Sequence, residues 1–147
     1  MKLVILDALL RLYEQNFRNL HWNAKGEDFN DSHKSITTEY YEMLAEDVDK
    51  VAEILSMLGK NPCNYPQALE IINADPGKFV IVDSEKLYTR KEIIEISAIM
   101  FNDICNLLSI AIEELENPLD AGIRSELETL LYNYTLQHRY INKRRSM

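Results

Sequence analysis

Two of the three histidines in this chain, His21 and His33, lie close together in the sequence and are the residues best suited to metal chemistry. Imidazole nitrogen binds Fe, Zn, Cu and Ni, and carboxylate oxygen adds affinity for hard or borderline cations. A metal site made of histidines and acidic residues is therefore one interpretation of this segment. Chance proximity of two histidines is the other.

Acidic residues recur at helical spacing further along the chain, and Asp49 and Glu53 are four residues apart. That spacing places both carboxylates on one face of a helix, as chelation of a single cation requires. At about 100° per residue, both point away from the apolar stripe of the same helix. They would meet a neighbouring subunit or only water. Glu42 and Glu46 extend this acidic face, and the apolar stripe consists of Tyr40, Leu44, Val48, Val51 and Leu55.

Two helices are predicted in the N-terminal half. The first runs from Leu3 to about Leu20, and the second begins near Asn30 to Ser32 and ends at Gly59, just before Pro62. The apolar positions of the first helix fall on one stripe, Leu6, Leu9, Leu10, Tyr13, Phe17 and Leu20.

Two more helices are predicted in the C-terminal half. Thr89 and Glu92 have the spacing of a capping box and open a helix that runs to about Glu116. The last helix runs from about Asp120 to Arg144, and its apolar face is Leu127, Leu130, Leu131, Tyr134, His138 and Ile141. On that face we expect His138 to be a hydrogen-bonded core histidine rather than a ligand.

The order of these helices predicts the fold. Each half is a pair of helices joined by a short turn, and a long crossover from Pro62 to Thr89 separates the halves. This is the connectivity of an all-α, ferritin-like four-helix bundle, in which the crossover lets the second and third helices run parallel. With 147 residues, we expect a single domain that spans positions 1–147.

The composition restricts the classes of binding partner that we expect for this chain. The formal net charge of -8 disfavours a main role in holding DNA or an anionic membrane. The short basic run Lys143-Arg144-Arg145 is the exception, and such a run is more often a solvated tail. We expect no bilayer-spanning stretch and a cytoplasmic location. Cys63 and Cys105 are far apart and do not predict a zinc site, although a disulfide is possible.

The segment around the first two histidines closely resembles the Dps family, whose proteins handle iron and detoxify peroxide. The resemblance rests on His21-Trp22-Asn23, Gly26, Phe29 and His33, twelve residues after His21. It implies a ferritin-like bundle with a short helix in the crossover. It also implies a hollow homo-dodecamer built from two-fold dimers, with iron sites between subunits. The metal ligands implied by the resemblance are His21 and His33 of one subunit with Asp49 and Glu53 of another.

The chain departs from the family pattern at two points. The family usually has an Asp four residues after the second histidine, whereas this chain has Thr37, a poor iron ligand, followed by Thr38. One extra residue also separates His33 from Asp49, so the two differ in direction by about 160° on an ideal helix. We predict a π-bulge or a late helix start between Ser32 and Glu46 that absorbs this residue.

A regular second helix would instead turn His33 towards the core and leave the site incomplete or dependent on Glu39 or Glu42. Trp22 and the Tyr40-Tyr41 pair would lie near the site, where their more ordinary role is packing. Nucleotide-binding loops and nucleophile motifs are not found in the sequence.

Two functions follow from these patterns. The first is oxidation of Fe²⁺ by H₂O₂ or O₂ at inter-subunit sites, with storage of the iron inside a closed oligomer. The second is a ferritin-like bundle that has lost oxidation chemistry and acts as a structural or interaction protein, which Thr37 and the register shift favour. We expect no nucleic-acid partner, because no Lys-rich segment precedes the first helix.

Overall fold

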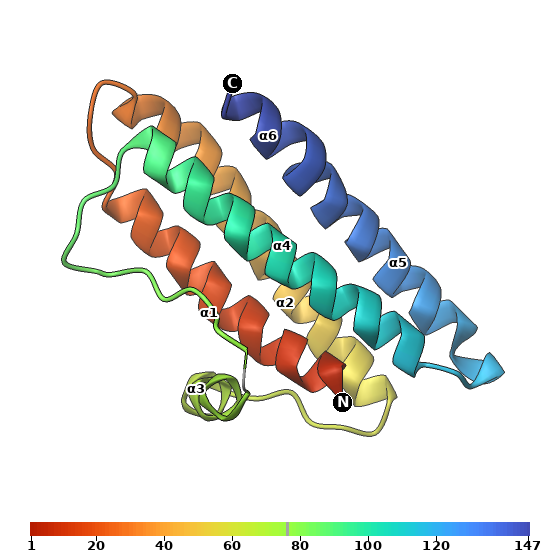
Figure 1. Cartoon of the computed structure of the whole chain (residues 1–147). Helices are drawn as coiled ribbons and strands as arrows, with labels where there is room; N and C mark the ends of the chain where they lie inside the picture. Colours follow the sequence, from red (N-terminus) through yellow and green to blue (C-terminus); the bar gives the residue numbers. More distant parts are fainter. Residues whose placement is uncertain (76) are drawn as a thin grey trace.

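Four long helical segments pack side by side in the computed structural model, which describes residues 1–75 and 77–147 (Figure 1). In chain order the elements are α1 (Lys2–Trp22), the π turn η1 (Asp31–Ile36), α2 (Thr37–Met57), α3 (Tyr65–Ala74), α4 (Arg90–Glu114), the 3₁₀ turn η2 (Pro118–Asp120), α5 (Ala121–Leu136), the π turn η3 (Gln137–Ile141) and α6 (Asn142–Arg145).

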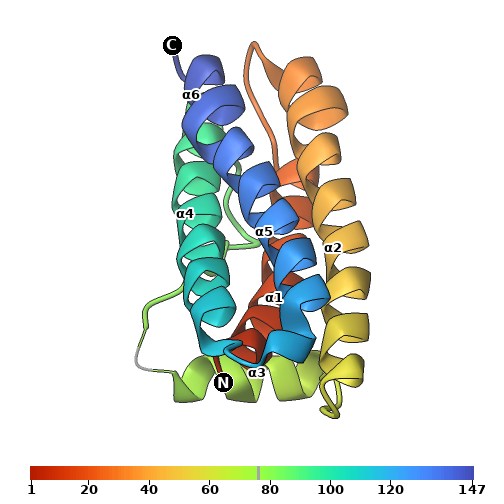
Figure 2. The same ribbon diagram turned by 90° about the vertical axis from the view of Figure 1, so that its right-hand side faces the viewer.

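The connectivity is that of a ferritin-like bundle. α1 and α2 form one antiparallel hairpin and α4 and α5 form the other, while α2 and α4 run in the same direction (Figure 1). The short helix α3 crosses the end of the bundle where the chain begins (Figure 2). The predicted four-helix architecture, with a short helix in the crossover, is therefore confirmed.

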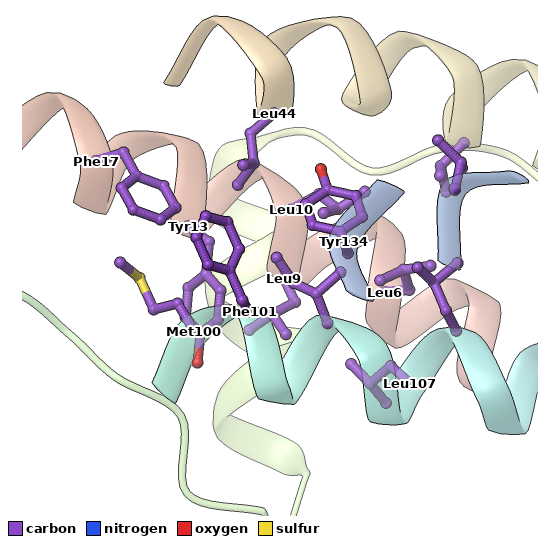
Figure 3. Close-up of a cluster of buried hydrophobic side chains, with 14 of the residues drawn as sticks. Leu6, Leu9, Leu10, Tyr13, Phe17, Leu44, Met100, Phe101, Leu107 and Tyr134 are labelled. Atoms are coloured by element: carbon purple, nitrogen blue, oxygen red, sulfur yellow. The ribbon is translucent and has the colours of Figure 1, made fainter. Parts of the chain in front are cut away.

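Every long helix contributes aromatic side chains to the buried core: Tyr13 and Phe17 of α1, Tyr40 of α2, Phe101 of α4 and Tyr134 of α5. Figure 3 shows Tyr13, Phe17, Phe101 and Tyr134 in this cluster. Phe17 stacks on Phe101 with ring centroids 5.4 Å apart and meets the Tyr40 ring edge-on at 5.3 Å. Each such pair adds roughly 0.5–1.5 kcal/mol beyond the burial of its area. The contact between Phe17 and Tyr40 joins α1 to α2, and Phe17 lies one turn before His21.

Helix ends follow the signals in the sequence. Gly59 has a φ of 77°, and the amide N–H of Lys60 donates to the carbonyl oxygen of Leu55 at 2.9 Å, which terminates α2 as predicted. Thr89 and Glu92 form the predicted capping box at the start of α4. A second capping box, Asn64 with Gln67, opens α3.

The crossover is held against α1 by polar side chains. Asn16 donates to the carbonyl oxygen of Val80 at 2.8 Å and accepts from the amide N–H of Val82 at 3.2 Å. The hydroxyl of Tyr13 accepts from the amide N–H of Val80 at 3.1 Å. These bonds satisfy partly buried backbone groups of the crossover that would otherwise lack a partner. Pro76, also in the crossover, lies outside the described residues.

The final helical segment differs from the expectation. Leu127, Leu130 and Tyr134 are buried as predicted, but the π turn η3 then rotates the chain, and Gln137 and Asn142 become the buried residues. The two expected core residues at this end, His138 and Ile141, are only half-buried. A π turn has hydrogen bonds between residues i and i+5, so it changes the direction of every later side chain around the helix axis. A pattern based on a regular α-helix does not anticipate this change.

The apolar helix α4 corrects a second expectation. It is long and apolar enough to cross a membrane by length and composition, with a mean hydropathy of 1.6 over eighteen residues. The expectation that no later stretch reaches this length was therefore wrong. One face of this helix packs inside the bundle, where Ile93, Met100, Phe101, Ile104 and Leu108 are buried, while Ile99 and Ile110 are exposed.

We predict opposite effects of alanine at two glycines. Gly59→Ala is expected to lower the free energy of unfolding by about 1 kcal/mol, because alanine resists the positive φ at this position. Gly122→Ala, in the first turn of α5 and free of close neighbours, is expected to raise it by about 0.5 kcal/mol. Urea unfolding of both variants measures the change in the free energy of unfolding. A loss of stability in both would contradict the different backbone roles of the two glycines.

Candidate metal centre

His21 and His33 meet at the end of the bundle where α1 leads into η1. Their imidazole rings are stacked, with centroids 3.9 Å apart and planes 11° from parallel. His21 belongs to the last turn of α1, and His33 lies inside the π turn. The structure therefore brings together the two histidines that the sequence analysis paired.

The predicted helix irregularity is present, because η1 is a π turn that spans Asp31–Ile36. It begins one residue before the predicted interval and continues directly into α2. A π turn takes up an extra residue within one turn of helix. Within η1, Ser32 and Ile36 are buried and His33 is half-buried, so His33 faces His21 rather than the core.

Protein groups hold one nitrogen of each imidazole ring. The Nδ1 atom of His33 lies 2.8 Å from the carbonyl oxygen of His21, and a carbonyl can only accept, so this nitrogen carries a hydrogen. The Nδ1 atom of His21 lies 3.1 Å from the hydroxyl oxygen of Thr37. Neither Nε2 atom forms a hydrogen bond with another described residue. The Nε2 atoms are therefore the ones available to a cation.

Aromatic neighbours restrict the rotation of both rings. Phe29 stacks on His33 with ring centroids 5.0 Å apart, which makes a three-layer stack of Phe29, His33 and His21. The Tyr41 ring meets the His21 ring edge-on at 5.3 Å, and the Arg18 guanidinium lies 4.4 Å from the centroid of Tyr41. Because these contacts already hold both imidazole rings in place, the rings would lose little conformational entropy on binding a metal.

The stacking geometry limits how the two rings can share a cation. An ion on the lone pair of one imidazole lies in the plane of that ring, at about 2.0–2.1 Å from nitrogen. The other ring is nearly parallel, with its centroid 3.9 Å away. One ion therefore cannot lie at bonding distance from both nitrogens unless a ring turns. As they stand, the two Nε2 atoms offer two neighbouring positions.

The surroundings of His21 favour its neutral form. Burial lowers the pKa of His21 below its usual value of 6.5, and the adjacent His33 and Arg18 lower it further, although the His33 backbone opposes the shift. A neutral imidazole is the form that binds metal ions. This site therefore keeps a free nitrogen lone pair at a lower pH than an isolated histidine would.

Asp49 and Glu53 are exposed on α2, pointing away from the bundle interior as predicted. Thr37 contacts His21, and Asp49 and Glu53 follow Thr37 by twelve and sixteen residues, or about 18 and 24 Å along a helix axis. Within one chain, these carboxylates and the histidines therefore cannot ligate the same ion. In residues 1–75 and 77–147, no group of three or more His, Cys, Asp or Glu side chains gathers.

The remaining residues of the histidine segment position the backbone. Asn23 donates to the carbonyl oxygens of Ser84 and Lys86, at 2.8 and 3.0 Å, and so holds the crossover beside the histidines. Gly26 has a φ of 102°, which other residues rarely adopt. Trp22 is 58% exposed. The motif thus couples the histidines to the crossover, a role the sequence analysis did not foresee.

The expected core histidine, His138, is not a hydrogen-bonded core residue. Its Nδ1 atom is buried without a hydrogen-bond partner among the described residues. The side chain lines a cavity of about 590 Å³ between α4 and the C-terminal segment, together with Ile94, Glu95, Ala98, Arg139, Asn142, Lys143 and Ser146. Burial and the nearby Arg139 and Lys143 lower the pKa of His138.

The C-terminal basic run is not simply a solvated tail. Arg145 donates to the carboxylate of Glu39 at 2.8 Å and to the hydroxyl of Tyr40 at 2.7 Å. The Arg144 guanidinium lies 5.1 Å from the centroid of the Tyr140 ring. Because Glu39 is engaged in this way, it is poorly placed to replace a missing metal ligand.

Cys63 and Cys105 are free thiols.

Comparison with solved structures identifies the class of fold. The chain superposes on the CAIP protein of Helicobacter cinaedi with a TM-score of 0.86 and 22% identity, over 99% of this chain and 97% of that one. It superposes on Dps from Staphylococcus aureus with a TM-score of 0.83 and 22% identity, over 99% and 93% of the two chains. For a Dps protein from Bacillus brevis the values are 0.82 and 18%, over 97% and 90%.

Sequence comparison adds a short but specific match. The DNA protection during starvation protein of Helicobacter pylori (strain J99) is 48% identical over 44 residues, which is 30% of this chain and 30% of that protein. No family model matches the chain. The chain is thus a ferritin-like four-helix bundle by fold. Within that class its resemblance to the Dps family is confirmed, in fold along nearly the whole chain and in sequence over 44 residues.

We predict that His21 titrates below pH 6.5 in the folded protein. Between pH 6.5 and the folded midpoint, the unfolded chain binds a proton that the folded chain does not. This residue's contribution to stability is therefore complete above pH 6.5 and declines as the pH falls towards the folded pKa. NMR titration of ¹⁵N-histidine-labelled protein measures the midpoint, with the urea-unfolded chain as the control. A folded midpoint at or above the unfolded one would contradict the account.

Proposed function

We propose that this chain is a Dps-like iron-handling protein. It binds Fe²⁺ at sites between subunits, oxidises it with H₂O₂ or O₂, and keeps the product inside a closed homo-oligomer, which limits oxidative damage. The observation that carries this proposal is the stacked pair of His21 and His33, in which the protein holds each Nδ1 and neither Nε2 is hydrogen-bonded to another described residue. Iron is the substrate and cargo of this site.

The missing oxygen ligands would come from a second subunit. Asp49 and Glu53 are exposed, are one helical turn apart and lie too far along α2 to reach the histidines of their own chain. A two-fold axis that pairs two α2 helices would bring the carboxylates of each subunit to the histidines of its partner. The resemblance to the Dps family implies this arrangement and a dodecamer of single-domain subunits.

The oxidation balances without any further reductant. With H₂O₂, two Fe²⁺ ions each lose one electron, and one H₂O₂ accepts both electrons with two protons to give two waters. With O₂, four Fe²⁺ ions each lose one electron, and one O₂ accepts the four electrons with four protons to give two waters. Hydrolysis of the Fe³⁺ product then releases protons. An acidic chain, with a net charge of -8, attracts the incoming cation and the oxidised product alike. The neutral His21 ring offers a nitrogen ligand without repelling the cation.

A second candidate function is a ferritin-like bundle without oxidation chemistry, which serves as a structural or interaction protein. Two observations favour it. Thr37 occupies the position where the family usually has a carboxylate ligand. Within residues 1–75 and 77–147, the hydrogen bonds and ring contacts of the two histidines also involve aromatic, hydroxyl and carbonyl groups and no carboxylate. Iron oxidation by the purified protein separates the two candidates.

We further propose a cytoplasmic protein that does not act by holding nucleic acid or a membrane. Few basic side chains of the C-terminal run are available to a partner, because Arg145 pairs with Glu39 and Arg144 lies against Tyr140. Phosphate binding needs clustered, available Lys and Arg side chains. The overall negative charge opposes such contacts as well.

The function is tested by anaerobic addition of Fe²⁺ to the purified oligomer, followed by H₂O₂. Oxidation is followed optically, and iron retained in the oligomeric fraction is assayed. We expect His21→Ala/His33→Ala to slow oxidation more than about tenfold, because the nitrogen ligands are lost. Glu126→Gln/Glu128→Gln, which removes two exposed negative charges from α5, is the matched control and should retain the activity. Equal rates in buffer, wild type and the histidine variant would exclude this function.

Mixed oligomers test whether the site is shared between subunits. Asp49→Asn/Glu53→Gln is expected to be as inactive as the histidine variant. When the two inactive variants are unfolded, mixed and refolded together, a dimer with one subunit of each kind contains one site with all four side chains intact. Random pairing should therefore restore about a quarter of the wild-type rate. No recovery in mixed oligomers of normal size would contradict an inter-subunit site.

A further inference from the structure

The buried Thr37 side chain lies between the π turn and the His21 ring. It is fully buried, with its hydroxyl oxygen 2.6 Å from the carbonyl oxygen of Ser32 and 3.1 Å from Nδ1 of His21. We propose that Thr37 is a positioning residue that fixes His21 in the tautomer with hydrogen on Nδ1 and a free lone pair on Nε2. The inference rests on the proposed function at one point, namely that the ligand of the His21 Nε2 atom is a divalent cation.

The hydrogen-bond directions follow from the atoms involved. A hydroxyl has one hydrogen, and a carbonyl oxygen can only accept one. The short contact between Thr37 and Ser32 therefore uses the hydroxyl hydrogen of Thr37. The Thr37 oxygen is left as an acceptor, so the 3.1 Å contact requires a hydrogen on Nδ1 of His21. A neutral imidazole carries one hydrogen, and Nε2 must then be bare.

The π turn makes this relay possible. In an α-helix the amide N–H of Thr37 would donate to the carbonyl of residue 33, but in η1 it donates to the carbonyl of Ser32. The hydroxyl of Thr37 reaches the same carbonyl, while the carbonyl oxygen of His33 is 3.5 Å away. The extra residue in the second helix thus turns the Thr37 hydroxyl towards His21.

The tautomer matters because neutral imidazole in water favours hydrogen on Nε2, the nitrogen that a cation would need here. An acceptor on Nδ1 reverses this preference before the metal arrives and also orients the ring. His33 reaches the same state by a different route, because its Nδ1 hydrogen is held by the carbonyl of His21. His33 therefore serves as an internal reference that does not depend on Thr37.

The neighbouring threonine provides a matched control. The hydroxyl of Thr38 is 3.4 Å from Nδ1 of His21, and it donates to the carbonyl oxygen of His33 at 2.9 Å. Its contact with the His21 ring is therefore longer than that of Thr37. Removal of the Thr38 hydroxyl should leave the His21 tautomer in place, although the chemical change is the same.

The tautomer is read directly from ¹⁵N NMR of the metal-free oligomer with labelled histidine, at a pH where His21 is neutral. We expect His21 and His33 to carry hydrogen on Nδ1 in the wild type and in Thr38→Val. In Thr37→Val, His21 should shift to the Nε2-hydrogen form while His33 stays unchanged. Thr37→Ser should restore the wild-type pattern. Circular dichroism and thermal unfolding establish that each variant is folded.

Binding of Co²⁺ alone, followed by its absorption spectrum, tests the consequence. Thr37→Val should weaken Co²⁺ binding about tenfold, with Thr37→Ser and Thr38→Val close to wild type. An unchanged His21 tautomer in folded Thr37→Val, or an Nε2-hydrogen form in the wild type, would overturn the inference. The inference would also be overturned if Thr37→Val bound Co²⁺ as tightly as the wild type and Thr37→Asp bound it more tightly. Thr37 would then mark only the position of a missing metal ligand. Wild-type protein that shows the expected tautomer but does not oxidise iron would refute the proposed function and leave Thr37 as a positioning residue.

Discussion

The candidate site depends on the way that one extra residue is accommodated at the start of the second helix. The π turn η1 absorbs this residue before α2 begins, so His33 faces His21 and not the core. The same turn directs two hydrogen-bond donors of Thr37, its amide and its hydroxyl, to the carbonyl of Ser32. A regular α-helix would change both arrangements at once. The ring stack, the ring nitrogens and the buried threonine therefore share one backbone constraint.

Residues from distant parts of the chain support this turn. Arg90, at the start of α4, donates to the carboxylate of Asp31 at 3.0 Å and to the carbonyl oxygen of Arg145 at 2.8 Å. Arg145 in turn donates to Tyr40 and Glu39 on α2. Exposed ion pairs contribute little individually, but these bonds form a network around a buried phenol. Burial raises the pKa of Tyr40 to about 12, although Arg145 opposes the shift.

Much of the fold could be predicted from the sequence, because helix periodicity and end signals are local. The buried stripe of α1, the termination at Gly59 and the capping box at Thr89 follow from such signals. The π turn η1 was predictable only because the family spacing revealed one residue too many. The second π turn, η3, had no such reference, so the burial of Gln137 and Asn142 was missed.

The site was predicted less completely than the fold. The pairing of His21 with His33 followed from the motif, but the role of Thr37 depends on a hydrogen bond to Ser32 that no spacing rule indicates. Residue type alone made Thr37 a poor ligand, and the structure shows that its hydroxyl contacts a histidine instead. In the proposed site, Asp49 and Glu53 come from a second subunit, and the order of residues in one chain does not determine how two subunits pair.

In the proposed site, the Nε2 atoms of His21 and His33 face the cation, and another subunit contributes Asp49 and Glu53. Anomalous diffraction from crystals of the oligomer, loaded with Fe²⁺ under anaerobic conditions, locates the metal most directly. We expect a peak at bonding distance from one or both Nε2 atoms and from the carboxylates of the other subunit. Iron bound only elsewhere, or a two-fold interface that leaves Asp49 and Glu53 in solvent, would contradict it.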